Sequence, residues 1–388
     1  MGICGSIAAY KCCDLLRLFL RSNLKVGVTL TKAASEFVTA ATFAALGADP
    51  VCTDMFPAEE HPFLHLYPGQ NADAFLIAPA TASMLSKILT NLSDDMLSCQ
   101  CLSFSGPLVI APAMNTRMWE NPATQQTVKE LGKRHHILVL PETGNLACGQ
   151  TGQGKLADME TLYLYTIRQL VPQDLAGKSI LITLGPTREP WDPVRFISNP
   201  SSGRMGASLA VAAWLRGAAV HVVHGPHNCR LPSEIDQIPV STAQEMLTAC
   251  SGLWPSMDIG CFTAAVTDFR PSSLAKEKWK RSPDTEDFSI QVTQNPDILR
   301  TLSHAKNNSQ IVIGFAAESN DLERHAQAKL KAKQCDLMVA NSIVAPGTGF
   351  QSPNNQVLIL DKHGRREQWP LLPKTEIAWR IWDWLSLL

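Results

Sequence analysis

The sequence has no long apolar run, no cysteines spaced as C-x-x-C and no excess of basic charge. No apolar run reaches the roughly 18 residues that a transmembrane helix needs, and the N-terminus lacks the charged-then-apolar pattern of a signal peptide. The eleven cysteines are scattered, which argues against a disulfide framework and a zinc site. A net charge of −1 gives no bias toward nucleic acid. We therefore expect a protein of the reducing cytoplasm that binds neither membranes nor nucleic acid.

What is present describes a large globular chain. Hydrophobic residues make up 45% and charged residues 18% of 388 positions, which suits two or three domains. A G-x-G-x-x-G motif between a strand and a helix is also lacking, so a dinucleotide cofactor is poorly supported.

Strand-like runs alternate with helical patterns in both halves of the chain, which predicts α/β domains with a parallel sheet flanked by helices, Rossmann-like or flavodoxin-like. The predicted strands are 25–31, 74–78, 108–111, 137–140, 179–183, 219–223, 259–266 and 311–315, with a late hairpin around 356–364. The predicted helices include 33–46, those capped at Asn121-Pro122 and Asn295-Pro296, and one opened by a capping box from Thr242 to Glu245. A polar break at 171–178 predicts a linker between domains 1–170 and 179–388.

The opening residues lack a strand that the fold requires. Gly2 and Gly5-Ser6 resemble a phosphate-binding turn before an amphipathic helix at 7–20, yet only Met1 precedes them. The first strand of the first domain is therefore expected to be missing. An N-terminus assigned too late is favoured over a domain without this strand, because its loss would leave neighbouring backbone groups unpaired.

A polar segment within 182–210 joins a strand to a helix and is far longer than such connections usually are. Residues 201–203 lie where backbone N–H groups at a helix N-terminus favour an anion. Forked donors suited to phosphate or carboxylate come from Arg188, Arg195 and Arg204. The segment predicts an anion-binding surface, and a long surface loop with solvated arginines is the alternative.

Further candidates for chemistry lie in both halves. In the first half the candidates are His65, Asn115 and Cys148. Each also has a plainer explanation: His65 could be a surface histidine, Asn115 a turn former and Cys148 a small buried residue. The glycine-rich loop 144–154 around Cys148 could close over a site as a flap. In the second half, Asp268 could hold a divalent cation. Basic residues that could bind a triphosphate beside it, or simply be solvated, are Lys276, Lys278, Lys280, Arg281, Lys329 and Lys333.

Several motifs identify families. GSIAAYK (5–11), APATA (78–82), PAMNTRMW (112–119) and ACGQTGQGKL (147–156) resemble the flavoprotein cysteine decarboxylases. GPTREPWDPVRFISNPSSGRMG (185–206) resembles the signature of phosphopantothenate–cysteine ligases. Both in one chain, in this order, resemble the bifunctional bacterial coenzyme A biosynthesis proteins.

The resemblance implies that the first domain binds FMN and decarboxylates 4'-phosphopantothenoylcysteine, since oxidation of the thiol by FMN creates the electron sink that the departing carboxylate needs. By analogy His65 assists thiol oxidation and decarboxylation, Asn115 binds the carboxylate, and Cys148 protonates the enethiolate. The implied FMN contacts are Gly5, Ser6, Ile7, Thr31, Ala80 and Thr81. Gln150 stands where the family has an acidic residue, and Leu-Tyr-Pro after His65 also departs from the pattern.

For the second domain, the resemblance implies that CTP, with Mg²⁺ or Mn²⁺ at Asp268, activates 4'-phosphopantothenate as an acyl-cytidylate that cysteine then attacks. Lys278 would neutralise phosphate charge and Asn199 would hold the acyl-cytidylate. The implied nucleotide positions are Thr263, Ala264, Asp268, Lys278, Pro296, Asp297, Ile298, Leu299, Phe315, Lys329 and Lys333. Arg204 stands where the family commonly has lysine.

The resemblance also suggests homo-oligomers, with trimeric contacts between flavin domains and dimeric contacts between ligase domains. Two other functions stay open: a ligase whose first domain no longer binds flavin, and a non-catalytic regulatory subunit.

Overall fold

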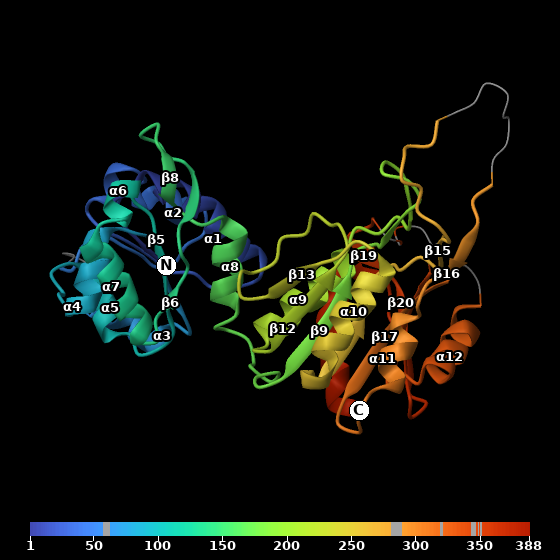
Figure 1. The fold of residues 1–388 in the computed structure, drawn as a ribbon. Helices are drawn as coiled ribbons and strands as arrows, with labels where there is room; N and C mark the ends of the chain where they lie inside the picture. The colour runs from blue at the N-terminus through green and yellow to red at the C-terminus, as the bar shows by residue number, and fades with distance from the viewer. Residues whose placement is uncertain (57–62, 281–288, 319–320, 343–346, 348, 350) are drawn as a thin grey trace. The chain divides into compact units, whose positions relative to one another are not determined.

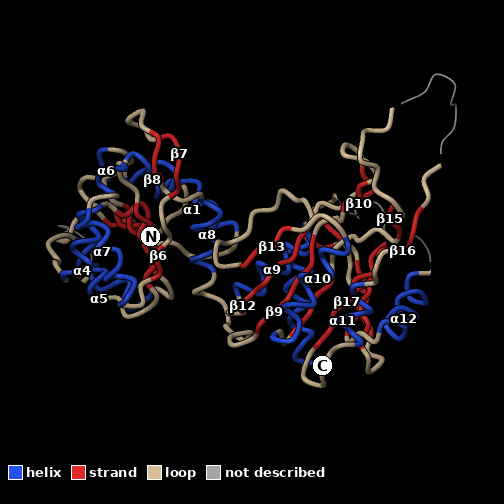
Figure 2. The backbone as a smooth tube through the Cα atoms, in the orientation of Figure 1, coloured by secondary structure: helices blue, strands red, loops and turns tan. Residues whose placement is uncertain are grey.

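The computed structural model describes residues 1–388 except 57–62, 281–288, 319–320, 343–346, 348 and 350. The chain divides into two compact units, 1–171 and 172–388 (Figure 1). Each unit has its own sheet with helices on both faces, as the backbone coloured by secondary structure shows (Figure 2). No helix in the described part is long and apolar enough to cross a membrane.

The first unit contains a six-stranded parallel sheet in the order β3-β2-β1-β4-β5-β6. Its strands are β1 (Gly2–Ile3), β2 (Val28–Leu30), β3 (Val51–Cys52), β4 (Phe75–Ala80), β5 (Leu108–Pro112) and β6 (Ile137–Leu138). Its helices are α1 (Cys12–Arg21), α2 (Ala40–Ala45), α3 (Tyr67–Asn71), α4 (Ala82–Thr90), α5 (Met96–Ser103), α6 (Thr116–Trp119), α7 (Pro122–Lys133) and α8 (Met159–Ile167). Helices α4, α5 and α7 pack together on one face, and α1 packs with α2 and α8 on the other (Figure 1). Strands β4 and β5 are therefore covered on both faces and buried along their whole length, which confirms the predicted α/β class.

Two local predictions need correction. The strand expected to be missing is present as β1, whose two residues pair with β2 and β4, while Thr29 N donates to Met1 O at 2.8 Å. The helix predicted over 33–46 is instead a 3₁₀ turn, Ala34–Glu36, followed by α2. Between them the β-branched Thr39 is extended, and β-branched residues lose side-chain freedom in a helix.

The second unit contains an eight-stranded sheet in the order β13-β12-β9-β14-β17-β18-β20-β21. Its strands are β9 (Ser179–Leu184), β12 (Ala219–His224), β13 (Asp236–Pro239), β14 (Ile259–Phe262), β17 (Ile311–Glu318), β18 (Leu337–Ser342), β20 (Val357–Asp361) and β21 (Arg366–Gln368). Its helices are α9 (Arg204–Leu215), α10 (Ala243–Leu253), α11 (Ile298–His304), α12 (Leu322–Lys333) and α13 (Lys374–Trp384). The first six strands are parallel, and β20 and β21 form the antiparallel hairpin predicted near 356–364. The predicted capping box of α10 is confirmed.

Short two-stranded ladders lie outside the two main sheets. They are β7 (Glu142–Asn145) with β8 (Thr151–Lys155), β10 (Arg188–Pro190) with β11 (Phe196–Ser198), β15 (Phe269–Pro271) with β16 (Val292–Gln294), and β19 (Asn354–Asn355) with β22 (Leu372–Pro373). The first three lie in or beside segments that the sequence analysis marks as functional.

The segment predicted as a linker is held against the second unit. Arg216, at the end of α9, is buried and forms ion pairs with Asp174 and, at 2.6 Å, with Asp383 of α13. Leu175 N also donates to Arg216 O at 2.9 Å, and Gln173 Nε2 donates to Leu215 O at 2.9 Å. These contacts hold residues 173–175 against the C-terminal end of α9.

Asp336, immediately before β18, should make the second unit sensitive to acid. The carboxylate is 3% exposed and accepts hydrogen bonds from Lys306 Nζ at 2.6 Å, Lys362 Nζ at 2.9 Å and Val312 N at 2.8 Å. Burial raises the pKa of Asp336, but these donors outweigh burial and hold it below 3.8. Its stabilisation is therefore present above pH 3.8 and lost as the pH falls through the lower folded-state pKa.

We expect Asp336→Asn to lower the free energy of unfolding at pH 7 by about 1–3 kcal/mol. The difference from the wild type should shrink toward pH 3, as measured by urea unfolding across that range. Glu376→Gln, which breaks only an exposed ion pair with Arg380, is the matched control and should change little. A difference that does not depend on pH would contradict the proposed charge state.

Candidate functional site

In the first unit, three hydroxyl side chains lie at one edge of the sheet. Ser6, Thr31 and Thr81 follow β1, β2 and β4, which are parallel neighbours. Their oxygens accept hydrogen bonds from Ala8 N at 3.3 Å, Ala34 N at 3.2 Å and Met84 N at 3.3 Å, each at the start of a helical segment. The start of α4 and two 3₁₀ turns, Ile7–Lys11 and Ala34–Glu36, therefore lie at the edge where ligands bind in open α/β sheets.

The other positions that the resemblance assigns to FMN lie in the same loops. Gly5 allows the loops after β1 and β2 to approach closely, because an added Cβ would lie 2.5 Å from Ala33 Cβ. Ile7 is exposed, and Ala80 is buried, with its carbonyl oxygen accepting from Ala113 N at 3.0 Å. This edge therefore fits a phosphate-bearing ligand with an apolar portion.

The structure brings Asn115 and Cys148 together. Asn115 caps α6, with Oδ1 accepting from Arg117 N at 2.9 Å. This bond leaves Nδ2 to donate to Cys148 Sγ and to Gln150 Oε1, both at 3.2 Å. Cys148 is exposed at the turn between β7 and β8. An amide and a thiol thus form one polar site over the end of β5.

The glycine-rich loop predicted as a flap is a β-hairpin, β7–β8, with an ordered turn. Leu146 N donates to Gln150 O at 2.8 Å, and Gly149 N donates to Leu146 O at 2.9 Å. At its base, Met114 N donates to Gly154 O at 3.0 Å. Gly154 has φ +143°, and an added Cβ would lie 2.2 Å from Met114 O. The glycine is thus required for the close approach of β8 to the residue before Asn115.

We expect Gly154→Ala to separate the hairpin from residues 114–115 and to destabilise the first unit by about 2 kcal/mol or more. Gly149→Ala is the control: this glycine also has a positive φ, but nothing lies within 4 Å of an added Cβ, so only about 1 kcal/mol of backbone strain is expected. Hydrogen exchange of the Met114 amide should become faster in Gly154→Ala alone. Equal effects of the two variants would contradict the packing role.

The structure does not join His65 to this pair. His65 lies in a 3₁₀ turn, Leu64–Leu66, that packs on α5, and its carbonyl oxygen accepts from Ser103 Oγ at 3.1 Å. Its Nδ1 is buried without a hydrogen-bond partner among the described residues. Within that part of the chain, no hydrogen bond links His65 to Asn115 or Cys148. Its role therefore stays a prediction.

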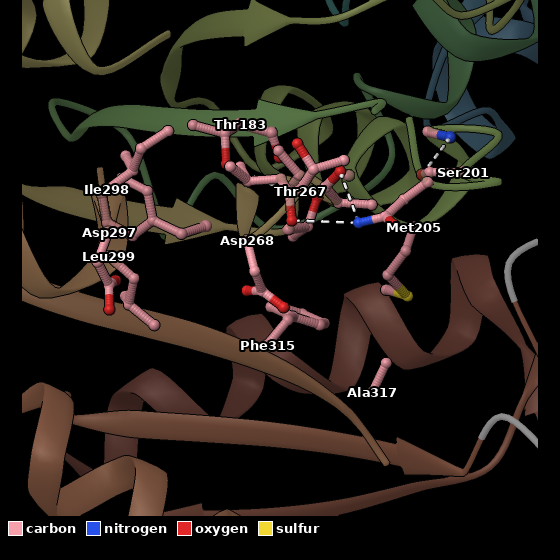
Figure 3. Close-up of a pocket in the computed structure, with 18 of the residues that line it drawn as sticks. Thr183, Ser201, Met205, Thr267, Asp268, Asp297, Ile298, Leu299, Phe315 and Ala317 are labelled. Atoms are coloured by element: carbon pink, nitrogen blue, oxygen red, sulfur yellow. Dashed lines mark hydrogen bonds between the residues drawn. The ribbon is translucent and has the colours of Figure 1, made fainter. Parts of the chain in front are cut away.

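The second unit contains a cavity of about 700 Å³ near the carboxyl ends of β9, β14 and β17 (Figure 3). Ten of the positions that the resemblance assigns to the nucleotide, the metal or the acyl-cytidylate line it: Asn199, Thr263, Ala264, Asp268, Pro296, Asp297, Ile298, Leu299, Phe315 and Lys333. The long segment at 182–210 thus forms part of the cavity wall rather than an isolated surface loop.

Asn199 connects two walls of the cavity. Its Nδ2 donates to Val266 O at 3.1 Å and to Ala265 O at 3.4 Å, so the segment before α9 is fixed to the loop after β14. Asp268 belongs to the same loop. In Figure 3, its carboxylate lies between Asp297 to Leu299 on one side and Ser201 and Met205 on the other. The cavity therefore has two sides separated by an acidic group.

One side is built by the start of α11. Asp297, rather than the predicted Asn295, caps this helix, with Oδ1 accepting from Arg300 N at 3.0 Å, and its other oxygen is paired with Lys333. Asn295 instead donates to Thr267 O at 2.8 Å, because its side chain turns toward the loop that carries Asp268.

Two of the predicted lysines lie elsewhere. Lys329 pairs with Glu318 at 2.7 Å and is not among the residues that line the cavity. Lys278 is exposed and also lies outside the cavity wall. Its neighbour is anchored, since Trp279 N donates to the buried Asp192 Oδ2 at 3.2 Å. Arg281 lies outside the described residues.

Several polar side chains of the wall were not predicted as site residues, among them Arg300, Asn341, Asn355 and Lys374. The least expected is Lys374, which is only 5% exposed at the start of α13. A cation at a helix N-terminus is unusual, because the helix dipole favours acidic groups there. A lysine at the first position of a helix was therefore the one feature of the sequence that could have marked Lys374 as a site residue.

The binding of a metal ion at Asp268 would depend on a phosphate-bearing ligand in the cavity. Among the described residues, no group of three or more histidine, cysteine, aspartate and glutamate side chains could hold a metal ion. A divalent cation at Asp268 would therefore take most of its oxygen ligands from a bound phosphate chain and water.

Comparison with known proteins supports the family resemblance of each half of the chain. Residues 1–171 match the Flavoprotein family and residues 175–388 match the DNA/pantothenate metabolism flavoprotein C-terminal domain. The coenzyme A biosynthesis bifunctional protein CoaBC of Vibrio vulnificus is 38% identical over 98% of this chain and 95% of its own. That of Bacillus subtilis is 36% identical, covering 100% and 96%. A crystal structure of a C-terminal domain of such a protein covers 55% of this chain and 97% of its own, with 37% identity and a TM-score of 0.47. The chain therefore belongs to the family of bifunctional coenzyme A biosynthesis proteins, with a flavoprotein domain followed by a pantothenate-metabolism domain.

Proposed function

We propose that this chain performs two consecutive steps of coenzyme A biosynthesis, with the second unit acting first. That unit joins 4'-phosphopantothenate to L-cysteine with CTP, and the first unit decarboxylates the 4'-phosphopantothenoylcysteine that results. The observation that carries the proposal is that the motifs of the two families form two separate sites, Asn115 with Cys148 in one unit and the cavity around Asn199 and Asp268 in the other.

In the ligase site, a carboxylate must be activated before an amine can displace its oxygen. Attack of the 4'-phosphopantothenate carboxylate on the α-phosphorus of CTP releases pyrophosphate and gives an acyl-cytidylate, and the cysteine amine then displaces CMP from the acyl carbon. We assign the nucleotide to the side of the cavity formed by 296–299, Phe315 and Lys333, and the acyl half to the side formed by 199–205. Mg²⁺ or Mn²⁺ held through Asp268 would neutralise phosphate charge between them.

Asn199 and Lys278 have different tasks in this scheme. Asn199 is fixed to the Asp268 loop, so it is suited to hold the acyl-cytidylate where the two sides of the cavity meet. Lys278 would have to move toward the phosphates, because it is exposed outside the cavity wall. Positively charged groups lower the barrier where negative charge builds up on phosphoryl and acyl oxygens.

In the decarboxylase site, FMN would bind at the edge marked by Ser6, Thr31 and Thr81, and would supply a two-electron acceptor for the cysteine thiol of the substrate. The amide nitrogen of Asn115 is placed to donate to the substrate carboxylate after leaving Cys148 and Gln150. Cys148 would then donate a proton to the enethiolate carbon as the electrons return from the cofactor. His65 would assist the thiol oxidation.

Two assays test the proposal. Purified protein should absorb near the flavin bands and should release pyrophosphate from CTP only when 4'-phosphopantothenate is present. A folded preparation that binds no added FMN but ligates cysteine would leave a ligase with a flavin-deficient first unit. A preparation with neither turnover would favour a regulatory subunit.

We also propose that the chain forms homo-oligomers, trimeric through the flavin units and dimeric through the ligase units. The first unit exposes several large apolar side chains that such contacts would cover, among them Ile7, Tyr10, Phe37 and Phe63. Light scattering of the purified protein measures the assembly directly, and a monomer at micromolar concentration would refute this part.

A further inference from the structure

We propose that Thr187 is a positioning residue of the ligase site, whose hydroxyl keeps the loop that carries Asp268 in register with the segment that carries Asn199. This inference deepens the proposed function and rests on it. Thr187 is 0% exposed and is not among the residues that line the cavity. It therefore acts through the two functional residues and not on the substrates.

Beyond β9 and β14, the two segments continue side by side as a short parallel ladder. Ala265 N donates to Gly185 O at 2.9 Å, in a parallel bridge that extends the pairing of the two strands. The bonds of a parallel ladder are evenly spaced, so the next one would join Thr267 N to the carbonyl oxygen of Thr187. That carbonyl oxygen instead accepts from Ser198 Oγ at 2.6 Å. The main chain therefore leaves the Thr267 amide without the acceptor that the ladder would supply.

The side chain of Thr187 supplies the acceptor in its place. Its Oγ1 accepts from Thr267 N at 3.3 Å, and Thr267 is 5% exposed. A buried N–H without an acceptor is costly, because no water replaces the lost hydrogen bond. Thr187 thus makes two bonds in different directions. Its side chain holds Thr267, and its main chain holds Ser198.

Each of these two bonds ends one residue away from a proposed functional group. Ser198 directly precedes Asn199, and Thr267 directly precedes Asp268. Asn199 Nδ2 in turn donates to Val266 O at 3.1 Å, which closes a ring of contacts between the two segments. A shift of the Thr267 bond therefore moves Asp268 relative to Asn199.

Asn295 holds the same loop from the other side. Its Nδ2 donates to Thr267 O at 2.8 Å, and its main-chain N donates to Asp268 O at 2.8 Å. Asn295 directly precedes the part of the wall that we assign to the nucleotide, and Thr187 belongs to the segment that we assign to the acyl half. Without the Thr187 hydroxyl, the loop should stay attached on the nucleotide side and become loose on the acyl side.

Such a loss of register has a chemical signature. An acyl-cytidylate that is poorly aligned with the cysteine amine reacts more slowly with it, because attack needs close and oriented groups. Water can then attack the acyl carbon, which returns 4'-phosphopantothenate and CMP. Pyrophosphate would be released without ligation of cysteine. A variant that is only less stable loses both products in proportion, so the ratio of pyrophosphate released to cysteine ligated separates positioning from stability.

The test compares Thr187→Val and Thr187→Ser with Thr166→Val, which removes a buried, hydrogen-bonded hydroxyl from α8 of the first unit as the control. We expect Thr187→Val to lower the kcat for ligation about 10-fold, as loss of one buried hydrogen bond predicts. It should also raise the ratio of pyrophosphate to ligated cysteine above that of the wild type. Thr187→Ser retains the hydroxyl and should recover most of both effects, and Thr166→Val should show neither. Thermal unfolding checks that each variant is folded.

Hydrogen exchange of the Thr267 amide in the full-length protein without substrates is independent of turnover. It should become about 10-fold faster in Thr187→Val and stay close to the wild-type rate in Thr187→Ser and Thr166→Val. Unchanged exchange in Thr187→Val, an unchanged product ratio, or an equal defect in Thr187→Ser would each overturn the proposal. A wild-type protein without turnover would count against the proposed function instead, and the exchange rates would still decide whether the hydroxyl holds the loop.

Discussion

Replacing Cys148 with serine is expected to lower the rate at which the saturated product, 4'-phosphopantetheine, forms at least about 100-fold, the lower range for loss of a general acid, while cysteine ligation is unchanged. The substitution replaces sulfur with oxygen and leaves the hairpin backbone as it is. An aliphatic hydroxyl is a far weaker proton donor than a thiol. The protonation step should therefore slow selectively, and the unsaturated enethiol product should accumulate.

The measurement is mass spectrometry of single-turnover mixtures that start from 4'-phosphopantothenoylcysteine. Cys99→Ser, in α5, is the matched control, because it makes the same atomic change at a position outside the Asn115 site. If Cys148→Ser decarboxylates and reduces its substrate at the wild-type rate, another group donates the proton. The turn between β7 and β8 would then have only a structural role.

Replacing Lys278 with glutamine should reduce cysteine ligation about 100-fold or more, since one preplaced charge donor is typically worth that much. Decarboxylation should be retained, because the two sites lie in separate units. The loss should fall mainly on kcat if Lys278 acts on the transition-state charge, and on the KM for CTP if it only binds the nucleotide.

Lys276→Gln is the control for Lys278→Gln, because both lysines are exposed in the same segment. Steady-state pyrophosphate release and carbon dioxide release measure the two activities on one preparation. Equal losses for the two lysines would indicate a general charge effect on CTP approach. Loss of both activities in Lys278→Gln would argue against independent sites.

Asp192 explains how the Lys278 segment is supported. Its buried carboxylate accepts hydrogen bonds from Val194 N and Arg195 N, both at 2.7 Å, as well as from Trp279 N. Burial raises the pKa of Asp192, but these backbone donors outweigh burial and lower it. The segment 185–206 thus has two structural tasks: it builds the cavity wall at Asn199 and anchors the base of the lysine segment.

Much of the architecture follows from local sequence. Continuous apolar runs predict β4, β5 and β9, since strands of a covered parallel sheet are buried on both faces. Thr242 with Glu245 and Asn121 with Pro122 predict the starts of α10 and α7, because capping uses groups only a few residues apart. The motifs likewise indicate decarboxylation for the first unit and ligation for the second. They can do so because each motif is a short, continuous segment of the sequence.

Tertiary structure alone decided which distant side chains meet. The Asn115–Cys148 contact depends on the path of β8 past Met114, and the presence of Arg204 and Lys374 in one cavity wall depends on the packing of α9 against α13. It also decided the partners of β1, which pairs with β2 on one side and β4 on the other. Periodicity and capping are local and can be read along the chain. Long-range contacts arise only when the whole core packs, so they follow from the fold and not from any one segment.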